Sequence, residues 1–203
     1  MTEDDIIKVY NEGNKSMKGV PFMARRIILD LAVTIDGFIE GKNGEVDWCM
    51  MDAEMGFTHF LHQIDTILYG RKSYDLWGQF TPGSESTEAE KEMWELVHSK
   101  KKYVFSKTQK GTDNQAIIIN DNILEEVNTL KNKPGKDIWL YGGASLITTF
   151  IHLGLVDEFR LSVHPVILGE GKPLFMDIKQ RLNVKLVHTR TFSSGVVQLI
   201  YRT

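Results

Sequence analysis

Two turns that contain glycine carry the residues whose types and spacing best suit chemistry. The first is Gly142-Gly143, which directly follows the apolar run at 138–141 and precedes apolar residues at helical spacing up to Gly154. A strand that runs through glycines into a helix points backbone N–H groups at one spot and leaves no side chain there, which suits a phosphate. A tight turn without a ligand is the commoner explanation for one such pair. The phosphate hypothesis therefore needs a second turn of this kind.

The second turn begins at Gly70, after the buried strand predicted at 64–69. Arg71, Lys72 and Ser73 follow, so that two cations and a hydroxyl stand where a helix begins. Taken alone, this turn is better explained as a solvated basic helix start. Two such turns in one chain favour a dinucleotide, because its several phosphates need separate binding groups.

Three carboxyl groups are candidates to face a substrate. Asp30 interrupts a nearly continuous apolar strand predicted at 26–35, so it must find a partner or face a cleft. Asp36 begins a long loop rich in glycine, and the length of such a loop suggests a function. Glu54 lies near the start of a helix predicted at 52–62, where favourable interaction with the helix dipole is the alternative to catalysis.

A metal site is not expected. His59 and His62 are three residues apart on the predicted helix at 52–62, but no third ligand accompanies them at metal-binding spacing. The single cysteine, Cys49, excludes an internal disulfide and a zinc site built from cysteines.

The order of the remaining elements predicts an α/β fold. Strand and helix patterns alternate up to Gly154, and two strands then flank a turn at 193–195. We therefore expect a mostly parallel central sheet with helices on both faces and an antiparallel hairpin at the C-terminus. In such sheets ligands bind at the carboxyl ends of the strands, where both glycine turns lie. The predicted strands are 26–35, 64–69, 103–106, 116–119, 138–141, 159–163, 184–192 and 196–201, and the helices include 87–98 and 122–131.

Length and charge limit the remaining choices. The chain of 203 residues suits one domain, at 23–203, preceded by a mobile N-terminal extension at 1–22. A net charge of −3 gives no electrostatic reason to expect binding to nucleic acid or to an anionic membrane. With one cysteine and no signal-peptide pattern, we expect a cytoplasmic protein.

Several motifs, in the same order along the chain, resemble dihydrofolate reductase. They are Ala32-Val33-Thr34, residues 41–48 followed by Glu54, residues 70–73, Val104-Phe105-Ser106 and residues 141–144. Residues 36–39, 157–161 and 165–171 are more similar to a sister branch, the reductase domain of the bifunctional riboflavin-pathway deaminase-reductase and its stand-alone bacterial relatives. The resemblance covers about residues 26–203, and it implies a dihydrofolate reductase-like α/β/α fold of three layers and a homodimer.

The resemblance also implies NADPH as the cofactor. By this analogy Arg71 would favour the 2′-phosphate, Ala32 would meet the nicotinamide carboxamide, and a cis peptide bond would join Gly142 to Gly143. The cofactor-binding residues implied are Ala32, Gly70, Arg71, Ser73, Ser106, Lys107, Tyr141, Gly142, Gly143, Ala144 and Ser145.

On the substrate side, the resemblance implies that Glu54 anchors an amino-pyrimidine ring and that Ser162 supports it, with Asp36 as a further catalytic candidate. Residues 98–102, HSKKK, stand where the folate branch carries an arginine for the glutamate tail, so dihydrofolate itself is not the expected substrate. We expect a reductase of a small nitrogen heterocycle. The alternatives are a non-enzymatic protein that binds a nucleotide or metabolite, and a phosphate-handling transferase, against which the absence of GxxxxGK[ST] argues.

Overall fold

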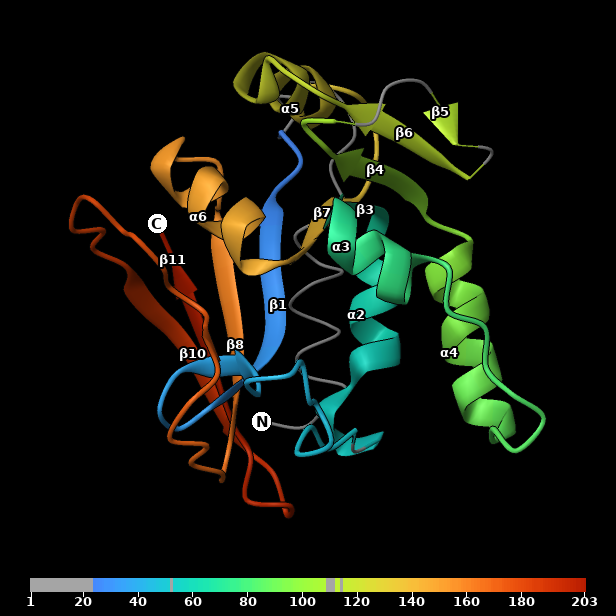
Figure 1. The fold of residues 1–203 in the computed structure, drawn as a ribbon, viewed down its shortest axis with the longest axis vertical. Helices are drawn as coiled ribbons and strands as arrows, with labels where there is room; N and C mark the ends of the chain where they lie inside the picture. The colour runs from blue at the N-terminus through green and yellow to red at the C-terminus, as the bar shows by residue number, and fades with distance from the viewer. Residues whose placement is uncertain (1–23, 52, 109–111, 114) are drawn as a thin grey trace, which may run out of the picture.

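A nine-stranded sheet runs through the centre of the protein (Figure 1). The computed structural model describes residues 24–51, 53–108, 112–113 and 115–203, so the extension predicted at 1–22 lies outside the described residues. The strand order is β10-β11-β8-β1-β7-β3-β4-β6-β5. The strands are β1 (Ile27–Thr34), β3 (Ile64–Gly70), β4 (Lys101–Phe105), β5 (Thr112–Asp113), β6 (Ala116–Ile119), β7 (Asp137–Gly142), β8 (Glu158–His164), β10 (Lys185–Thr191) and β11 (Val197–Arg202). A separate pair joins β2 (Phe38–Glu40) to β9 (Lys172–Pro173).

The central strands are parallel, and the strands at both ends of the sheet are antiparallel. The pairs from β8 through β1, β7, β3 and β4 to β6 are all parallel. The C-terminal hairpin of β10 and β11 pairs antiparallel with β8, as predicted, and Gly195 in its turn has a φ of 86°. The short strand β5, which sequence analysis missed, adds a second antiparallel edge. The expected α/β fold is confirmed.

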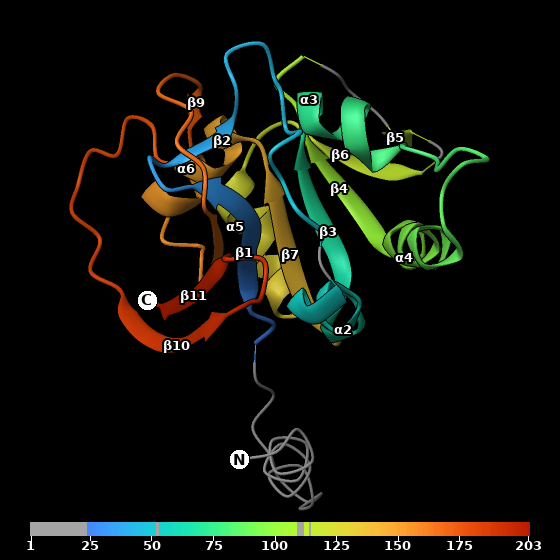
Figure 2. The same ribbon diagram turned by 90° about the horizontal axis from the view of Figure 1, so that it is seen from below.

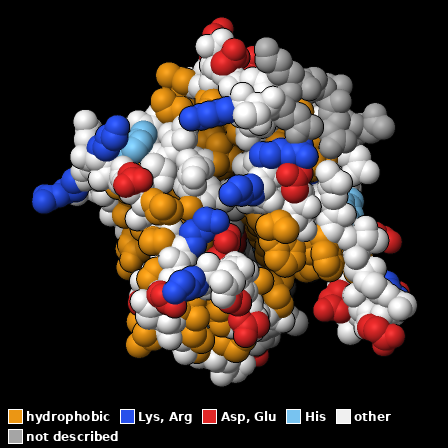
Figure 3. All heavy atoms as spheres, viewed as in Figure 1, with side chains coloured by type: hydrophobic (Ala, Val, Ile, Leu, Met, Phe, Trp, Pro, Cys, Tyr) orange, Lys and Arg blue, Asp and Glu red, His pale blue; other side chains and the backbone are white. Residues whose placement is uncertain are grey.

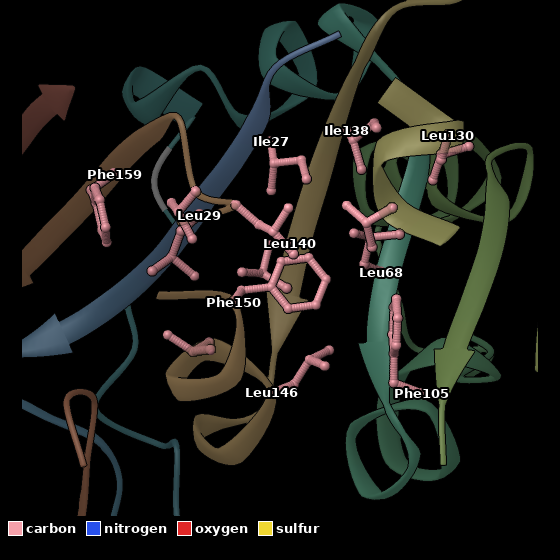
Figure 4. Packing of buried hydrophobic residues seen from close by; sticks show 14 of the residues in the cluster. Ile27, Leu29, Leu68, Phe105, Leu130, Ile138, Leu140, Leu146, Phe150 and Phe159 are labelled. Atoms are coloured by element: carbon pink, nitrogen blue, oxygen red, sulfur yellow. The ribbon is translucent and has the colours of Figure 1, made fainter. Parts of the chain in front are cut away.

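Helices cover both faces of the sheet (Figures 1 and 2). On one face, α5 (Ile123–Lys131) and α6 (Ala144–His152) pack on a buried cluster that includes Ile27, Leu29 and Leu140 (Figure 4). On the other, α2 (Phe57–Gln63) and α4 (Glu88–His98) pack on a cluster that includes Ile28 and Trp139. Because successive side chains of a strand alternate between faces, Asp30 and Ala32 of β1 lie on the α2 face together with Ile28.

The helix predicted at 52–62 is divided in two. A 3₁₀ turn, η1 (Ala53–Met55), precedes Gly56, whose φ of 68° interrupts the helix before α2 begins. Glu54 therefore lies in a short 3₁₀ turn rather than in the first turn of an α-helix. The expectation of an α-helix there is wrong because the left-handed conformation that glycine adopts readily separates the two turns.

The other helix predictions are largely confirmed. Thr87 caps α4 with a full capping box with Glu90, as its sequence predicts. Asn122 precedes α5 but does not cap it with its side chain. The helix expected after Gly70 is a three-residue turn, α3 (Arg71–Ser73), continued by a π-helical turn, η2 (Tyr74–Gly78). None of the helices in the described ranges is long and apolar enough to cross a membrane.

Pairing between β1 and β7 ends early. Pairing between β1 and β7 covers only Ile27–Leu29 with Ile138–Leu140, whereas pairing between β1 and β8 continues to Thr34 and His164. The chain leaves β7 and crosses β1 to reach β8, so the direction of winding changes at β1. Such a switch point, at the carboxyl ends of the strands, is the usual place for a ligand in an open α/β sheet.

Candidate functional site

The two glycine turns meet at the carboxyl ends of β3 and β7. Tyr69 pairs with Gly142, and a Cβ added to Gly70 would lie 3.3 Å from the backbone nitrogen of Gly143 and 3.4 Å from the Gly142 oxygen. The peptide bond between Gly142 and Gly143 is cis, as the resemblance implies. A Cβ at Gly143 would lie 3.1 Å from the Ser73 hydroxyl oxygen, so the second turn presents a hydroxyl to the first.

The helix starts at these turns are not capped by side chains. The N-cap residues are Gly143 for α6 and Gly70 for α3, and no side chain forms a capping hydrogen bond at either helix start. In α6, the Gly143 carbonyl accepts from Leu146 and Ile147, which leaves the N–H groups of Ala144 and Ser145 at the end of the helix, where such groups have no intrahelical acceptor. This arrangement suits an anion, since it combines backbone donors, the positive end of a helix dipole and a hydroxyl.

Arg71 lies at the same turn but is paired within its own segment. Its Nη2 and Nε atoms contact the Asp75 carboxylate at 2.5 and 2.8 Å, while its Nη1 atom is buried without a hydrogen-bond partner among the described residues. Several Lys and Arg side chains also lie near the middle of the face that carries α3 and α6 (Figure 3). A phosphate that bound here would supply the acceptor that Nη1 lacks.

The other residues implied in cofactor binding lie at the same edge of the sheet. Ser106 and Lys107 follow β4, and the Asn120 side chain, after β6, donates to the Ser106 carbonyl at 2.7 Å. Tyr141 precedes the glycines and packs against Tyr69 with ring centroids 4.8 Å apart. Burial, with Cys49 and Glu40 nearby, raises the pKa of the Tyr141 hydroxyl. The loop between β1 and α2 therefore reaches the end of β7.

A second group of implied residues lies on the α2 face of β1 and β8. Ala32 of β1 pairs in register with Ser162 of β8, and two residues earlier on each strand Asp30 pairs with Arg160. Aromatic side chains stand beside them: Trp139 of β7 contacts Phe57 of α2 with ring centroids 5.5 Å apart. A flat ring could bind against such aromatic walls.

Asp36 and Glu54 hold loops in this structure. Asp36 accepts hydrogen bonds from Thr34 Oγ1 and from the backbone N–H groups of Leu168 and Gly169. The Thr34 hydrogen bond, more than those from the backbone, lowers the pKa of Asp36. Glu54 is exposed and accepts from the Ser193 hydroxyl, at 3.1 Å, in the turn between β10 and β11. Asp36 thus links the end of β1 to the loop at 168–169, and Glu54 links η1 to the turn between β10 and β11.

Sequence reasoning missed two contacts. Asp75 pairs with Arg71, although the spacing of four residues on a helical turn was a usable signal. The Trp139 indole donates to the Asp30 carbonyl at 2.9 Å, which no local pattern could indicate because the two residues belong to different strands. Among the residues that the structure describes, no three His, Cys, Asp or Glu side chains are grouped so as to hold a metal ion.

Comparison with known proteins agrees with this geometry. The family described as the RibD C-terminal domain matches residues 25–198. The uncharacterized protein YyaP of Bacillus subtilis (strain 168) is 80% identical over 177 residues, which cover 87% of this chain and 94% of YyaP.

Solved structures share the fold at low sequence identity. A putative riboflavin biosynthesis protein from Shewanella sp. PV-4 matches with a TM-score of 0.72 and 21% identity, over 87% of this chain and 98% of that chain. Dihydrofolate reductase from Enterococcus faecalis, solved in complex with NADP(H), matches with a TM-score of 0.60 and 16% identity, over 87% of this chain and 95% of that chain. The dihydrofolate reductase-like fold expected from the sequence is therefore confirmed.

Proposed function

This chain belongs to the RibD C-terminal domain family, and from that premise we propose that it is an NADPH-dependent reductase of a small nitrogen heterocycle, of the pyrimidine or pterin type. The observation that carries the proposal is the contact between Gly70 and Gly143, with the Ser73 hydroxyl facing Gly143. It brings the two glycine turns together at the carboxyl ends of β3 and β7, beside the switch point at β1, where a dinucleotide can lie along the strand ends.

The residues present fit NADPH. The pyrophosphate would be held by backbone N–H groups at the start of α6, from Gly142, Gly143, Ala144 and Ser145. Glycine is needed at position 143 because a side chain there would occupy the space next to Ser73. Gly70, Arg71 and Ser73 would bind the phosphates on the adenosine side, with the Arg71 guanidinium favouring the 2′-phosphate. Ser106 and Lys107 would border the adenine ribose, while Tyr141 and Ala32 would line the nicotinamide end.

The protein's part in the reaction is to position and polarise the substrate. NADPH supplies a hydride when it is bound, and the chain must hold the acceptor ring beside Ala32 in a site closed to water. Glu54 would exchange its contact with Ser193 for the N–H edge of the ring, and Ser162 would support the ring from β8. Asp36 would keep the loop at 168–169 against the end of β1.

A titration followed by turnover assays tests this proposal. NADPH should bind with higher affinity than NADH, and a panel of pterins, pyrimidines and quinones should include a compound whose addition oxidises NADPH. Absence of NADPH binding would refute the proposed function. Binding without oxidation across the panel would instead favour a non-enzymatic nucleotide- or metabolite-binding protein of the same fold.

We also propose that the chain forms a homodimer through the edge of the sheet at β10. All seven residues of β10 are exposed, including Leu186 and Val187, and exposed Leu182 and Val184 precede it. An exposed edge strand with apolar side chains is a pairing surface. Sedimentation should show a dimer that Leu186→Asp converts to a monomer, and a monomeric wild type would refute this. We place the protein in the cytoplasm, where NADPH is available.

A further inference from the structure

Asp30 lies where the pairing between β1 and β7 ends. The residue before it, Leu29, is the last residue of β1 that pairs with β7, and the Asp30 carbonyl accepts from the Trp139 indole instead of continuing that pairing. The Asp30 side chain lies on the same face as that of Ala32, which is two residues nearer the carboxyl end of β1. Asp30 is thus at the inner end of the site in which the proposed function places the substrate ring.

The Asp30 carboxyl group has no protein partner among the described residues. It forms no hydrogen bond and no ion pair with them, whereas Asp36 and Glu54 both bind later loops. Arg160, its neighbour in register, is engaged elsewhere. Its Nε donates to Glu158 at 2.6 Å, its Nη1 donates to Gln63 at 3.2 Å, and its guanidinium lies 5.2 Å from the centre of the Phe60 ring. A half-buried carboxyl group without such contacts adds no ion pair or hydrogen bond to the fold, which makes it a candidate for a functional role.

The surroundings of Asp30 raise the pKa of its carboxyl group to near neutrality. Burial is the largest influence and raises the pKa of Asp30 to about 7, while Arg160 opposes the rise and Glu158 adds to it. Arg26, which precedes β1, and Arg202 of β11 contact Glu158. On the same face α2 contributes Phe57, Phe60 and Gln63, and β7 contributes Trp139 and Tyr141. The titratable groups there besides Arg160 and Glu158 are Tyr141, whose pKa burial raises further, Cys49 near it, and His164, four residues beyond Arg160 on β8. A carboxyl group that can give up and regain a proton near pH 7 has the property required of a general acid.

We propose that Asp30 is the proton donor of this reductase, acting on a C=N or C=O bond of a flat ring that lies between the aromatic side chains and Ala32. The inference rests on the proposed function. The carbon of that bond accepts the hydride, with its two electrons, from the dihydronicotinamide, and the nitrogen or oxygen accepts the proton of the Asp30 carboxyl group. Asp30 then regains a proton from water. The net change is reduction of the C=N or C=O bond and oxidation of the dihydronicotinamide. The substrate is therefore an uncharged conjugated imine or carbonyl compound rather than one already protonated at the reacting bond.

The first test needs no cofactor and no substrate. Carbon-13 NMR of the aspartate carboxyl groups of the full chain should show one group that titrates near neutral pH, and Asp30→Asn should remove that signal. Glu92→Gln, a matched change of acid to amide on the exposed side of α4, should leave it in place. Titration of the Asp30 carboxyl near pH 4 would overturn the proposal, because an ordinary solvated carboxylate carries no proton to donate at pH 7.

The second test uses the compound that the panel identifies. Asp30→Asn should lower kcat by about 100-fold or more with little change in KM, and it should remove the fall of the rate above pH 7. Asp30→Glu should restore part of the rate and of the pH dependence. Glu54→Gln, at the residue proposed to anchor the ring, should change KM and kcat but retain the pH profile. A wild-type enzyme that turns over while Asp30→Asn keeps its rate and profile would refute this inference alone, whereas failure of the wild type to bind NADPH would refute the proposed function.

Discussion

Gly70 lies against the backbone of Gly143, and the absence of a side chain at Gly70 permits this close approach. A Cβ at Gly70 would approach the Gly143 nitrogen to 3.3 Å, and a Cβ at Gly143 would approach the Ser73 hydroxyl to 3.1 Å. Contacts of this length are tighter than those that most Cβ atoms make, so the two turns pack this closely only while both residues are glycines.

A side chain at Gly143 should block the cofactor without unfolding the chain. The φ of Gly143 is −81°, which any residue can adopt, so the effect of Gly143→Val comes from the side chain that projects toward Ser73. We expect NADPH affinity to fall by at least about tenfold, or about 1.4 kcal/mol. Calorimetric titration measures this, and thermal melting should show a native-like transition. Gly83→Val, in open space, is the control. If the variant retained its affinity for NADPH, Gly143 would not belong to the binding site.

Arg71 should distinguish NADPH from NADH. Loss of a charge-assisted contact with the 2′-phosphate costs about 1.5–3 kcal/mol, so Arg71→Ala should weaken NADPH binding by roughly 10- to 100-fold and NADH binding much less. Parallel titrations with the two cofactors measure the difference. Lys72→Ala, at the exposed neighbouring cation, serves as the comparison. Equal weakening of both cofactors would argue that Arg71 has no role at the 2′-phosphate.

Glu158 should make the fold sensitive to acid. It is buried and accepts from Arg26, Arg160 and Arg202, at 3.0, 2.6 and 2.8 Å. Burial alone would raise the pKa of Glu158, but the three guanidinium groups outweigh it and lower the pKa below 4.5. A group whose pKa is lower in the folded state stabilises the fold above its unfolded pKa, and this contribution is lost as the pH falls below about 4.5.

Replacing this carboxylate tests that relationship. Glu158→Gln should lower the free energy of unfolding at pH 7 by about 3 kcal/mol, because three arginines lose their shared partner. Urea unfolding from pH 7 down to pH 3 should also show a flatter acid dependence than the wild type. Glu92→Gln controls for the change of charge. A variant as stable as the wild type at pH 7 would mean that the arginines are satisfied by water.

Asp30 should have the opposite effect on stability. Its pKa rises from 3.8 to about 7 on folding, so the folded chain binds a proton that the unfolded chain does not bind between those values. Stability from this group is therefore fully present below about pH 4 and is lost as the pH rises through about 7. The shift of about 3 units corresponds to at most about 4 kcal/mol, and hydration of the half-buried carboxylate should reduce the measured value to about 1–3 kcal/mol.

Urea unfolding of Asp30→Asn at pH 5 and pH 8 measures this cost. The variant should be more stable than the wild type at pH 8, and the advantage should shrink at pH 5. If the Asp30 carboxylate instead formed a stabilising ion pair with Arg160, the wild type would be more stable than the variant at pH 8. The expected gain in stability on removal of Asp30 also fits a residue retained for function.

The sequence alone determined the fold class and the positions of the two glycine turns that we propose bind phosphates, because strand and helix periodicities and glycine positions are local properties of the chain. It also predicted the C-terminal hairpin, in whose turn Gly195 adopts the left-handed conformation. It did not determine the break at Gly56, because the pattern around Glu54 suits a continuous helix and the conformation of a single glycine decides otherwise. Only the tertiary structure decided that Gly70 contacts Gly143 and that the Asp30 carboxyl group has no protein partner among the described residues. These two features depend on which strands are neighbours in the sheet and where pairing between β1 and β7 ends, and both result from packing between segments that are distant in the sequence.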